Sequence, residues 1–272
     1  MMRMLIMSTI SAVRENRHKV KPIVFVDIPI VNIPSVDTMQ KVASTPDLFR
    51  VKCFDRWLIF IPLFTIAISI AQVVCFYAIQ PSSGYKLGLL VPCPPNQWYR
   101  TLTNMFAHID NTHLWTNVGS TLLLGSIIEV RNGFIRIAPI WYLSAFVGTT
   151  FQSLISSRPV RILGSSGGVY ALLGALLSEL GMNWKEIRYR WLYLSLFVLI
   201  FTLEIVLGSL DPQPNIAYGA HFFGAFYGFT IGLCLIKNWR WRRHEYLVFL
   251  LALLCAIGAF GTIVGLLPRI FE

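Results

Sequence analysis

Long apolar runs, separated by short polar or basic segments, recur along most of this chain. About 20 consecutive apolar residues are needed for a helix to cross the hydrocarbon core of a bilayer. Seven runs approach or reach this length, and the second of them is the shortest. The predicted spans lie at about 57–79, 114–130, 134–155, 163–181, 190–210, 217–236 and 246–267. The pattern therefore predicts an all-α polytopic membrane protein.

The predicted spans divide the chain into three parts. These are an N-terminal segment at 1–56, a membrane domain at 57–267 and a short tail at 268–272. The apolar stretch at 23–33 is interrupted by Asp27 and Pro29, which makes it too short to span. The chain start lacks the apolar core and small-residue cleavage site of a secretory signal. We therefore expect a loosely structured N-terminal segment, with the first span serving as signal anchor.

Composition and charge support a membrane protein and predict its orientation. Apolar residues make up 55% of the chain and charged residues only 13%, while the net charge is +10. With residue 1 in the cytoplasm, eighteen of the twenty-three Lys and Arg residues fall on the cytoplasmic side of the predicted spans. The N-terminus is thus expected inside and the C-terminus outside. The basic residues are interpreted as a topology signal that contacts anionic lipid, and not as a nucleic-acid surface.

Cysteine and leader patterns add little to this interpretation. The five cysteines, at positions 53, 75, 93, 234 and 255, show no paired spacing and predict neither a disulfide framework nor a zinc site. No cofactor is predicted. Residues 1–21 contain a single acid, Glu15, among several basic residues, so the composition leaves a mitochondrial leader open.

Four residues with chemical potential lie toward the same side of the predicted bundle. His113 and Asn117 lie at the start of span two, Ser166 near the start of span four and His221 near the start of span six. All three spans run from outside to inside. We therefore expect these side chains to form one site near the outer surface, where a histidine could activate a serine nucleophile.

Helical spacing strengthens this expectation. His113 and Asn117 are four residues apart, as are Ser166 and Tyr170, so each pair shares a helix face. On span six, His221 shares its face with three glycines that would let another helix approach closely: Gly224, Gly228 and Gly232. If spans four and six pack through these faces, Ser166 and His221 come within hydrogen-bonding reach.

Other interpretations of the same residues remain open. Residues 164–168 also fit the Gly-x-Ser-x-Gly elbow of soluble hydrolases, and a serine in a membrane helix often bonds to a carbonyl one turn earlier. A metal site formed by His108, His113 and His221 is disfavoured, because an i, i+5 pair does not share a helix face. Glu204, an acid within span five, is interpreted as a satisfied helix contact or gate element in preference to a catalytic acid.

Three separated motifs resemble those of the rhomboid intramembrane serine proteases, over about residues 57–267. They are Gly164-Ser165-Ser166-Gly167 followed by Tyr170, Ala220-His221 followed by Gly224 and Gly228, and the His-x4-His-x3-Asn spacing of His108, His113 and Asn117. The extra span after His221 resembles the secretase-type arrangement of six spans plus one. One departure is Trp98-Tyr99-Arg100, where the family commonly carries Trp-Arg.

The resemblance implies roles for these residues. Ser166 would be the nucleophile and His221 its general base and acid, while His113, Asn117 and the Ser166 backbone N–H would bind the oxyanion. Tyr170 would pack against His221, and His108 would order the loop. Gly164 and Gly167 would allow irregular backbone where span four begins, and Gly224 and Gly228 would support packing.

The resemblance also implies a substrate and a location. Substrates would be single-span membrane proteins cut in or near the transmembrane segment, with release of their ectodomains. The arrangement of spans favours the secretory pathway over the mitochondrial inner membrane. The alternative is an inactive rhomboid-like protein that binds client transmembrane helices for trafficking or degradation. A transporter is a weaker third reading, because no inverted repeat is evident.

Overall fold

The computed structural model describes residues 61–83, 87–91, 97–156, 160–210 and 217–271. The chain divides into one unit at Met1–Thr45 and another at Pro46–Glu272, and every described residue belongs to the second unit. The predicted N-terminal segment, the first four residues of the first predicted span and Cys53 and Cys93 lie outside the described residues.

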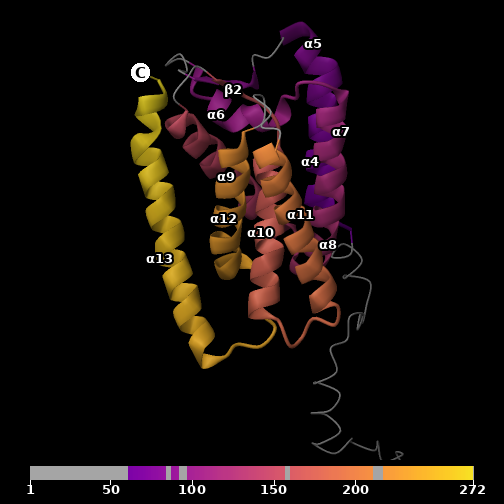
Figure 1. Ribbon diagram of the computed structural model, residues 1–272, viewed down its shortest axis with the longest axis vertical. Helices are drawn as coiled ribbons and strands as arrows, with labels where there is room; N and C mark the ends of the chain where they lie inside the picture. The colour runs from indigo at the N-terminus through magenta and orange to yellow at the C-terminus, as the bar shows by residue number, and fades with distance from the viewer. Residues whose placement is uncertain (1–60, 84–86, 92–96, 157–159, 211–216, 272) are drawn as a thin grey trace, which may run out of the picture. The chain divides into compact units, whose positions relative to one another are not determined.

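Helical segments overlap each of the seven predicted spans (Figure 1). The first comprises α4 (Leu63–Val74), the π-helical turn Cys75–Ile79 and α5 (Gln80–Ser83), and the second comprises α7 (Asn111–Ser120), the π-helical turn Thr121–Gly125 and α8 (Ser126–Asn132). The others are α9 (Phe134–Ile155), α10 (Ser166–Met182), α11 (Arg190–Leu210), α12 (Tyr218–Leu235) and α13 (Arg243–Leu266). The loop before α7 holds α6 (Arg100–Thr103) and the 3-10 turn Asn104–Phe106.

Two stretches of helix in the described part of the chain are long and apolar enough to cross a membrane by length and composition alone. They are Phe134–Ile155 and Arg243–Ile270, and three shorter apolar helices cover Leu63–Ile79, Ser166–Met182 and Arg190–Leu203. The mostly helical fold agrees with the sequence analysis. The seven-span arrangement stays a prediction.

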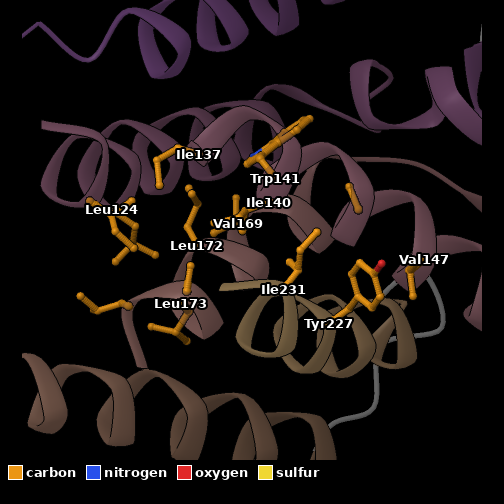
Figure 2. Packing of buried hydrophobic residues seen from close by; sticks show 14 of the residues in the cluster. Leu124, Ile137, Ile140, Trp141, Val147, Val169, Leu172, Leu173, Tyr227 and Ile231 are labelled. Carbon is orange, nitrogen blue, oxygen red and sulfur yellow. The ribbon is translucent and has the colours of Figure 1, made fainter. Parts of the chain in front are cut away.

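The apolar core lies where α9, α10 and α12 pack together. Figure 2 shows Trp141 of α9, Leu172 of α10 and Tyr227 of α12 among the buried side chains of this cluster. Trp141 and Leu172 are buried, and the indole of Trp141 occupies the space where a Cβ on Gly168 would lie. The segment predicted to carry the nucleophile is therefore packed against this buried cluster.

Glycines bring the backbones of α10 and α12 into direct contact. A Cβ on Gly224 would collide with the carbonyl oxygen of Gly167, and one on Gly228 would collide with the backbone of Ala171. On the other helix, Gly174 lies in the same way against the carbonyl of Ala225. Such close approach of small-residue faces fixes the separation of two helices more tightly than larger side chains do.

A short antiparallel sheet lies beside the helices at the end of the molecule where α10 begins (Figure 1). Strand β1 (Leu89–Val91) pairs with β2 (Val160–Ile162), and Leu89 lies opposite Ile162. The predicted all-α fold omitted this sheet, because three-residue strands carry too little alternation to be recognised. After α13, Leu267–Ile270 forms a 3-10 turn in which Ile270 is buried. The position of the tail outside the membrane stays a prediction.

Glu129 of α8 caps the beginning of α4, a contact that the sequence analysis missed. Its two carboxylate oxygens accept hydrogen bonds from the backbone N–H groups of Phe64 and Thr65, each at 2.8 Å, and from the Thr65 hydroxyl at 2.6 Å. Helix starts leave several N–H groups without intrahelical acceptors, and negative charge there is favourable. Glu129, which is 2% exposed, thus joins two helices 64 residues apart in sequence.

Substitution of Glu129 by glutamine should lower the free energy of unfolding by about 1–3 kcal/mol, because the new amide NH₂ would face a backbone N–H. Thermal unfolding in detergent measures the change. Glu186→Gln is the matched control, since Glu186 is partly exposed and its ion pair with Arg242 is worth less than about 1 kcal/mol. Equal shifts in the two variants would contradict the assignment of a capping role to Glu129.

Candidate active site

Ser166 and His221 lie together at the beginnings of α10 and α12. Ser166 is the first residue of α10, and His221 lies in the first turn of α12. The Ser166 Oγ and the His221 Nε2 are 2.8 Å apart. Both side chains are half-buried. With Nε2 unprotonated, the imidazole can accept the hydroxyl proton, which is the contact that activates a serine for nucleophilic attack.

The neighbouring serine has a different environment. The Ser165 hydroxyl donates a hydrogen bond to the Oε1 of Gln72 on α4 at 2.7 Å, and both residues are 0% exposed. The Ser165 carbonyl accepts hydrogen bonds from the N–H groups of Gly168 and Val169 at the start of α10. The two adjacent serines thus have different partners. Ser166 contacts the imidazole of His221, whereas Ser165 stabilises the turn at the start of α10.

Gly164 gives the chain its sharp entry into α10. Its φ of +107° is a conformation that favours glycine, and its N–H donates to the carbonyl of Asn104 at 3.1 Å. A Cβ at this position would lie 2.7 Å from the ring of His113. Gly167 was expected to allow irregular backbone, but it lies within the regular helix α10. Its carbonyl oxygen instead lies where a Cβ on Gly224 would be, so the two helices approach closely here.

Two aromatic rings hold the imidazole of His221. Tyr170, one turn after Ser166, stacks on it with ring centroids 4.4 Å apart and an interplanar angle of 13°. Tyr218 meets the same ring edge-on at 6.3 Å. The sequence analysis identified Tyr170 but missed Tyr218, although its i, i+3 spacing from His221 was a usable signal. Contacts on two sides restrict rotation of the ring and keep Nε2 directed at Ser166.

His113 and Asn117 extend the site from α7. Asp110 caps this helix by accepting a hydrogen bond from the His113 N–H at 2.8 Å. The Asn117 Nδ2 donates to the His113 carbonyl at 2.9 Å. An amide nitrogen carries two N–H groups, so it can donate a second hydrogen bond. A Cβ on Gly164 would lie 3.6 Å from this Nδ2 as well as against the His113 ring. Both side chains therefore border the residue that lies two positions before Ser166.

His108 lies next to His113, near the end of the loop that leads into α7. Its backbone is held by Gln80, whose Nε2 donates to the His108 carbonyl at 2.7 Å and whose Oε1 accepts from the His108 N–H at 3.1 Å. The ring is fully buried and meets the ring of His113 edge-on at 5.2 Å. Burial, and then the nearby His113, lowers the pKa of His108 from its usual 6.5 to about 3.

The lowered pKa predicts acid sensitivity. Below pH 6.5 the unfolded chain binds a proton at His108 that the folded protein excludes until about pH 3. This residue's contribution to stability is therefore complete above pH 6.5 and is lost as the pH falls, by about 1.4 kcal/mol per pH unit. Thermal unfolding in detergent between pH 8 and pH 5 should show a smaller decrease for His108→Phe than for the wild type. His244→Phe, at an exposed histidine, is the control, and identical pH slopes in all three proteins would refute the assignment.

Three acids, Asp110, Glu204 and Asp211, do not add a carboxylate to the part of the site that the structure describes. Asp110 is engaged in capping α7. Asp211 and the side chain of Glu204 lie outside the described residues. Within the ranges that the structure describes, no three His, Cys, Asp or Glu side chains are grouped to hold a metal ion. The pairing of a serine hydroxyl with an imidazole nitrogen is the arrangement that acyl transfer through a serine requires.

Comparison with known proteins shows the family to which the chain is similar. Residues 95–238 match the Rhomboid domain family. The chain is 31% identical to RHOMBOID-like protein 7 of Arabidopsis thaliana, over 55% of its own length and 47% of the relative. It is 29% identical to Rhomboid-related protein 1 of Caenorhabditis elegans, over 74% of the chain and 63% of the relative. For RHOMBOID-like protein 6, mitochondrial, of Arabidopsis thaliana, the identity is 32% over 53% and 45%. The chain thus spans less than two thirds of the length of these relatives.

Proposed function

The chain belongs to the rhomboid family, and from that premise we propose that it is an intramembrane serine protease. Its rhomboid domain makes it a membrane protein. The observation that carries the proposal is the 2.8 Å separation of the Ser166 Oγ and the His221 Nε2. The substrates would be single-span membrane proteins, cut in or near their transmembrane segments.

In the first step of the proposed reaction, the Ser166 Oγ attacks the carbonyl carbon of the scissile peptide bond. His221 accepts the hydroxyl proton at Nε2, and the carbonyl oxygen becomes an oxyanion. Side-chain donors of His113 and Asn117, together with the Ser166 backbone N–H, would bind this oxyanion. In a site of low dielectric each such donor stabilises developing charge more strongly than it would in water.

In the following steps the C–N bond breaks as His221 returns its proton to the leaving amine. The product with the new amino terminus departs, and the other half of the substrate remains as an ester of Ser166. Water then attacks the ester while His221 accepts its proton, and the collapse of the second oxyanion returns the proton to the Ser166 oxygen. A Ser-His dyad suffices for this sequence when stacking orients the imidazole. The stacked ring of Tyr170 would serve this purpose.

The proposal includes the predicted topology of six spans plus one, with the N-terminus in the cytoplasm. The site would then lie toward the outer leaflet, where water can enter and ectodomains can be released. Membrane lipids would surround the bundle and contact its basic cytoplasmic segments. The extra helix α13 after His221 favours the secretory pathway, and a relative named as mitochondrial keeps the inner mitochondrial membrane as the other location to be tested.

The proposal is tested with the full-length chain reconstituted in liposomes together with a tagged single-span reporter whose transmembrane helix carries glycine and small polar residues. An intact apolar helix resists cleavage because its carbonyls are already hydrogen-bonded. The expected result is a product from the wild type and none from Ser166→Ala. Equal product from both would assign cleavage to a contaminant, and co-purification of uncut reporter would favour the inactive, helix-binding alternative.

A further inference from the structure

The end of helix α13 is folded onto the same end of the molecule as the Ser-His pair. After Leu266 the chain forms the 3-10 turn Leu267–Ile270, and the Ile270 side chain is only 1% exposed. It lies in an apolar cluster with Leu89, which is 0% exposed, and Ile162, which is 2% exposed. The burial of Ile270 therefore ties this turn to the β1–β2 sheet.

This cluster adjoins both segments that deliver the reactive side chains. Ile162 closes strand β2 four residues before Ser166, and its partner across the sheet is Leu89. Ala217, four residues before His221, packs against the same cluster, and its carbonyl accepts a hydrogen bond from the His221 N–H at 3.2 Å. Ile270 thus shares one apolar cluster with Ile162, in the strand that precedes Ser166, and with Ala217, which precedes α12 and His221.

The sheet needs such a cover to be ordered. It has two strands of three residues each, and an isolated two-stranded sheet of this size has marginal stability. Leu89 and Ile162 lie directly opposite each other, and the side chain of Ile270 is the third fully buried member of their cluster. Removal of that side chain would leave the first two with an unfilled space and a more mobile backbone.

We propose that Ile270 is a positioning residue for the dyad. Through Ile270, the turn after α13 holds the β1–β2 sheet and the start of α12 in the relative position that brings Ser166 and His221 together. This inference rests on the proposed protease function. The inference gives α13 a role in the reaction, in addition to any contact of this helix with lipid. The geometry of the site would then depend on the turn Leu267–Ile270.

The test uses the full-length chain in liposomes with the tagged single-span reporter. Ile270→Ala should lower kcat by about 10- to 100-fold with little change in KM, since a displacement of about 1 Å can cost 100-fold. Ile270→Leu, which restores the buried volume, should recover most of the loss. Ile257→Ala is the matched control, because Ile257 lies on α13, the helix that leads into this turn, and its side chain is 62% exposed. This variant should keep the wild-type kcat. Thermal unfolding confirms that each variant is folded at the assay temperature.

A second measurement does not depend on activity. Hydrogen–deuterium exchange in residues 160–166 should be faster in Ile270→Ala than in the wild type, and Leu89→Ala should produce the same change without adding to it in the double variant. If Ile270→Ala keeps both the wild-type kcat and the wild-type exchange rates, the inference is overturned. The wild type could also cleave no reporter while exchange in residues 160–166 is still faster in Ile270→Ala than in the wild type. In that case the proposed function fails, but the contact between Ile270 and the sheet stands.

Discussion

Replacement of Ser166 by alanine lowers kcat for the single-span reporter by roughly 10⁴- to 10⁶-fold, to the level without protein. His221→Ala should have nearly the same effect, and the double variant should be no slower than either single one. The reason is that nucleophile and base act as a unit, with the Ser166 Oγ and the His221 Nε2 2.8 Å apart. Quantitative gel analysis of reporter cleavage in liposomes, at matched protein levels, measures the effect.

Ser165 supplies the control for this prediction. Ser165→Ala removes a hydroxyl from the adjacent position, but that hydroxyl donates its hydrogen bond to Gln72. The expected loss is at most about tenfold, corresponding to one hydrogen bond. If Ser165→Ala abolished cleavage while Ser166→Ala did not, the assignment of the nucleophile would be wrong.

Replacement of Asn117 by alanine should lower kcat by about 10²- to 10³-fold, with KM changed only a few-fold. Its amide can donate to the oxyanion, and this bond would form only as the carbonyl oxygen acquires charge. His113→Ala should give a comparable loss for the same reason. Steady-state kinetics over a range of reporter concentrations in the bilayer separates kcat from KM.

Thr121→Val is the matched control for the oxyanion prediction. Thr121 follows Asn117 by one helical turn, is fully buried and makes no side-chain hydrogen bond within the described residues. The substitution preserves shape and should leave kcat unchanged. A rise in KM without a fall in kcat for Asn117→Ala would mean that Asn117 binds the substrate equally in the ground state, and the oxyanion role would be rejected.

The helices and the candidate pair could be predicted from the sequence because both depend on local signals. Helical segments overlap each of the seven apolar runs. The four-residue spacing of Ser166 and Tyr170 predicts that they share a helix face. The glycines at 224 and 228 likewise indicated close packing, and they lie against Gly167 and Ala171 of α10. These inferences need only helical periodicity and the chemistry of single residues.

Contacts between distant segments could not be predicted in the same way. Glu129 caps α4 from 64 residues away, and Gln72 bonds Ser165 across 93 residues. Ile270 had the appearance of a tail residue, because its burial depends on a sheet whose strands are too short to recognise. Each of these contacts depends on where two elements meet in space, and hydrophobic periodicity carries no information about that.

Activation of Ser166 by His221 is tested most directly by the rate and site of labelling with a fluorophosphonate. The probe reacts with an activated serine oxygen, which displaces fluoride from phosphorus, so no knowledge of the substrate is required. Peptide mass mapping of the labelled wild type is expected to find the adduct on Ser166, with labelling lost in His221→Ala. An adduct on Ser165, or equal labelling of Ser166 with and without His221, would contradict the account.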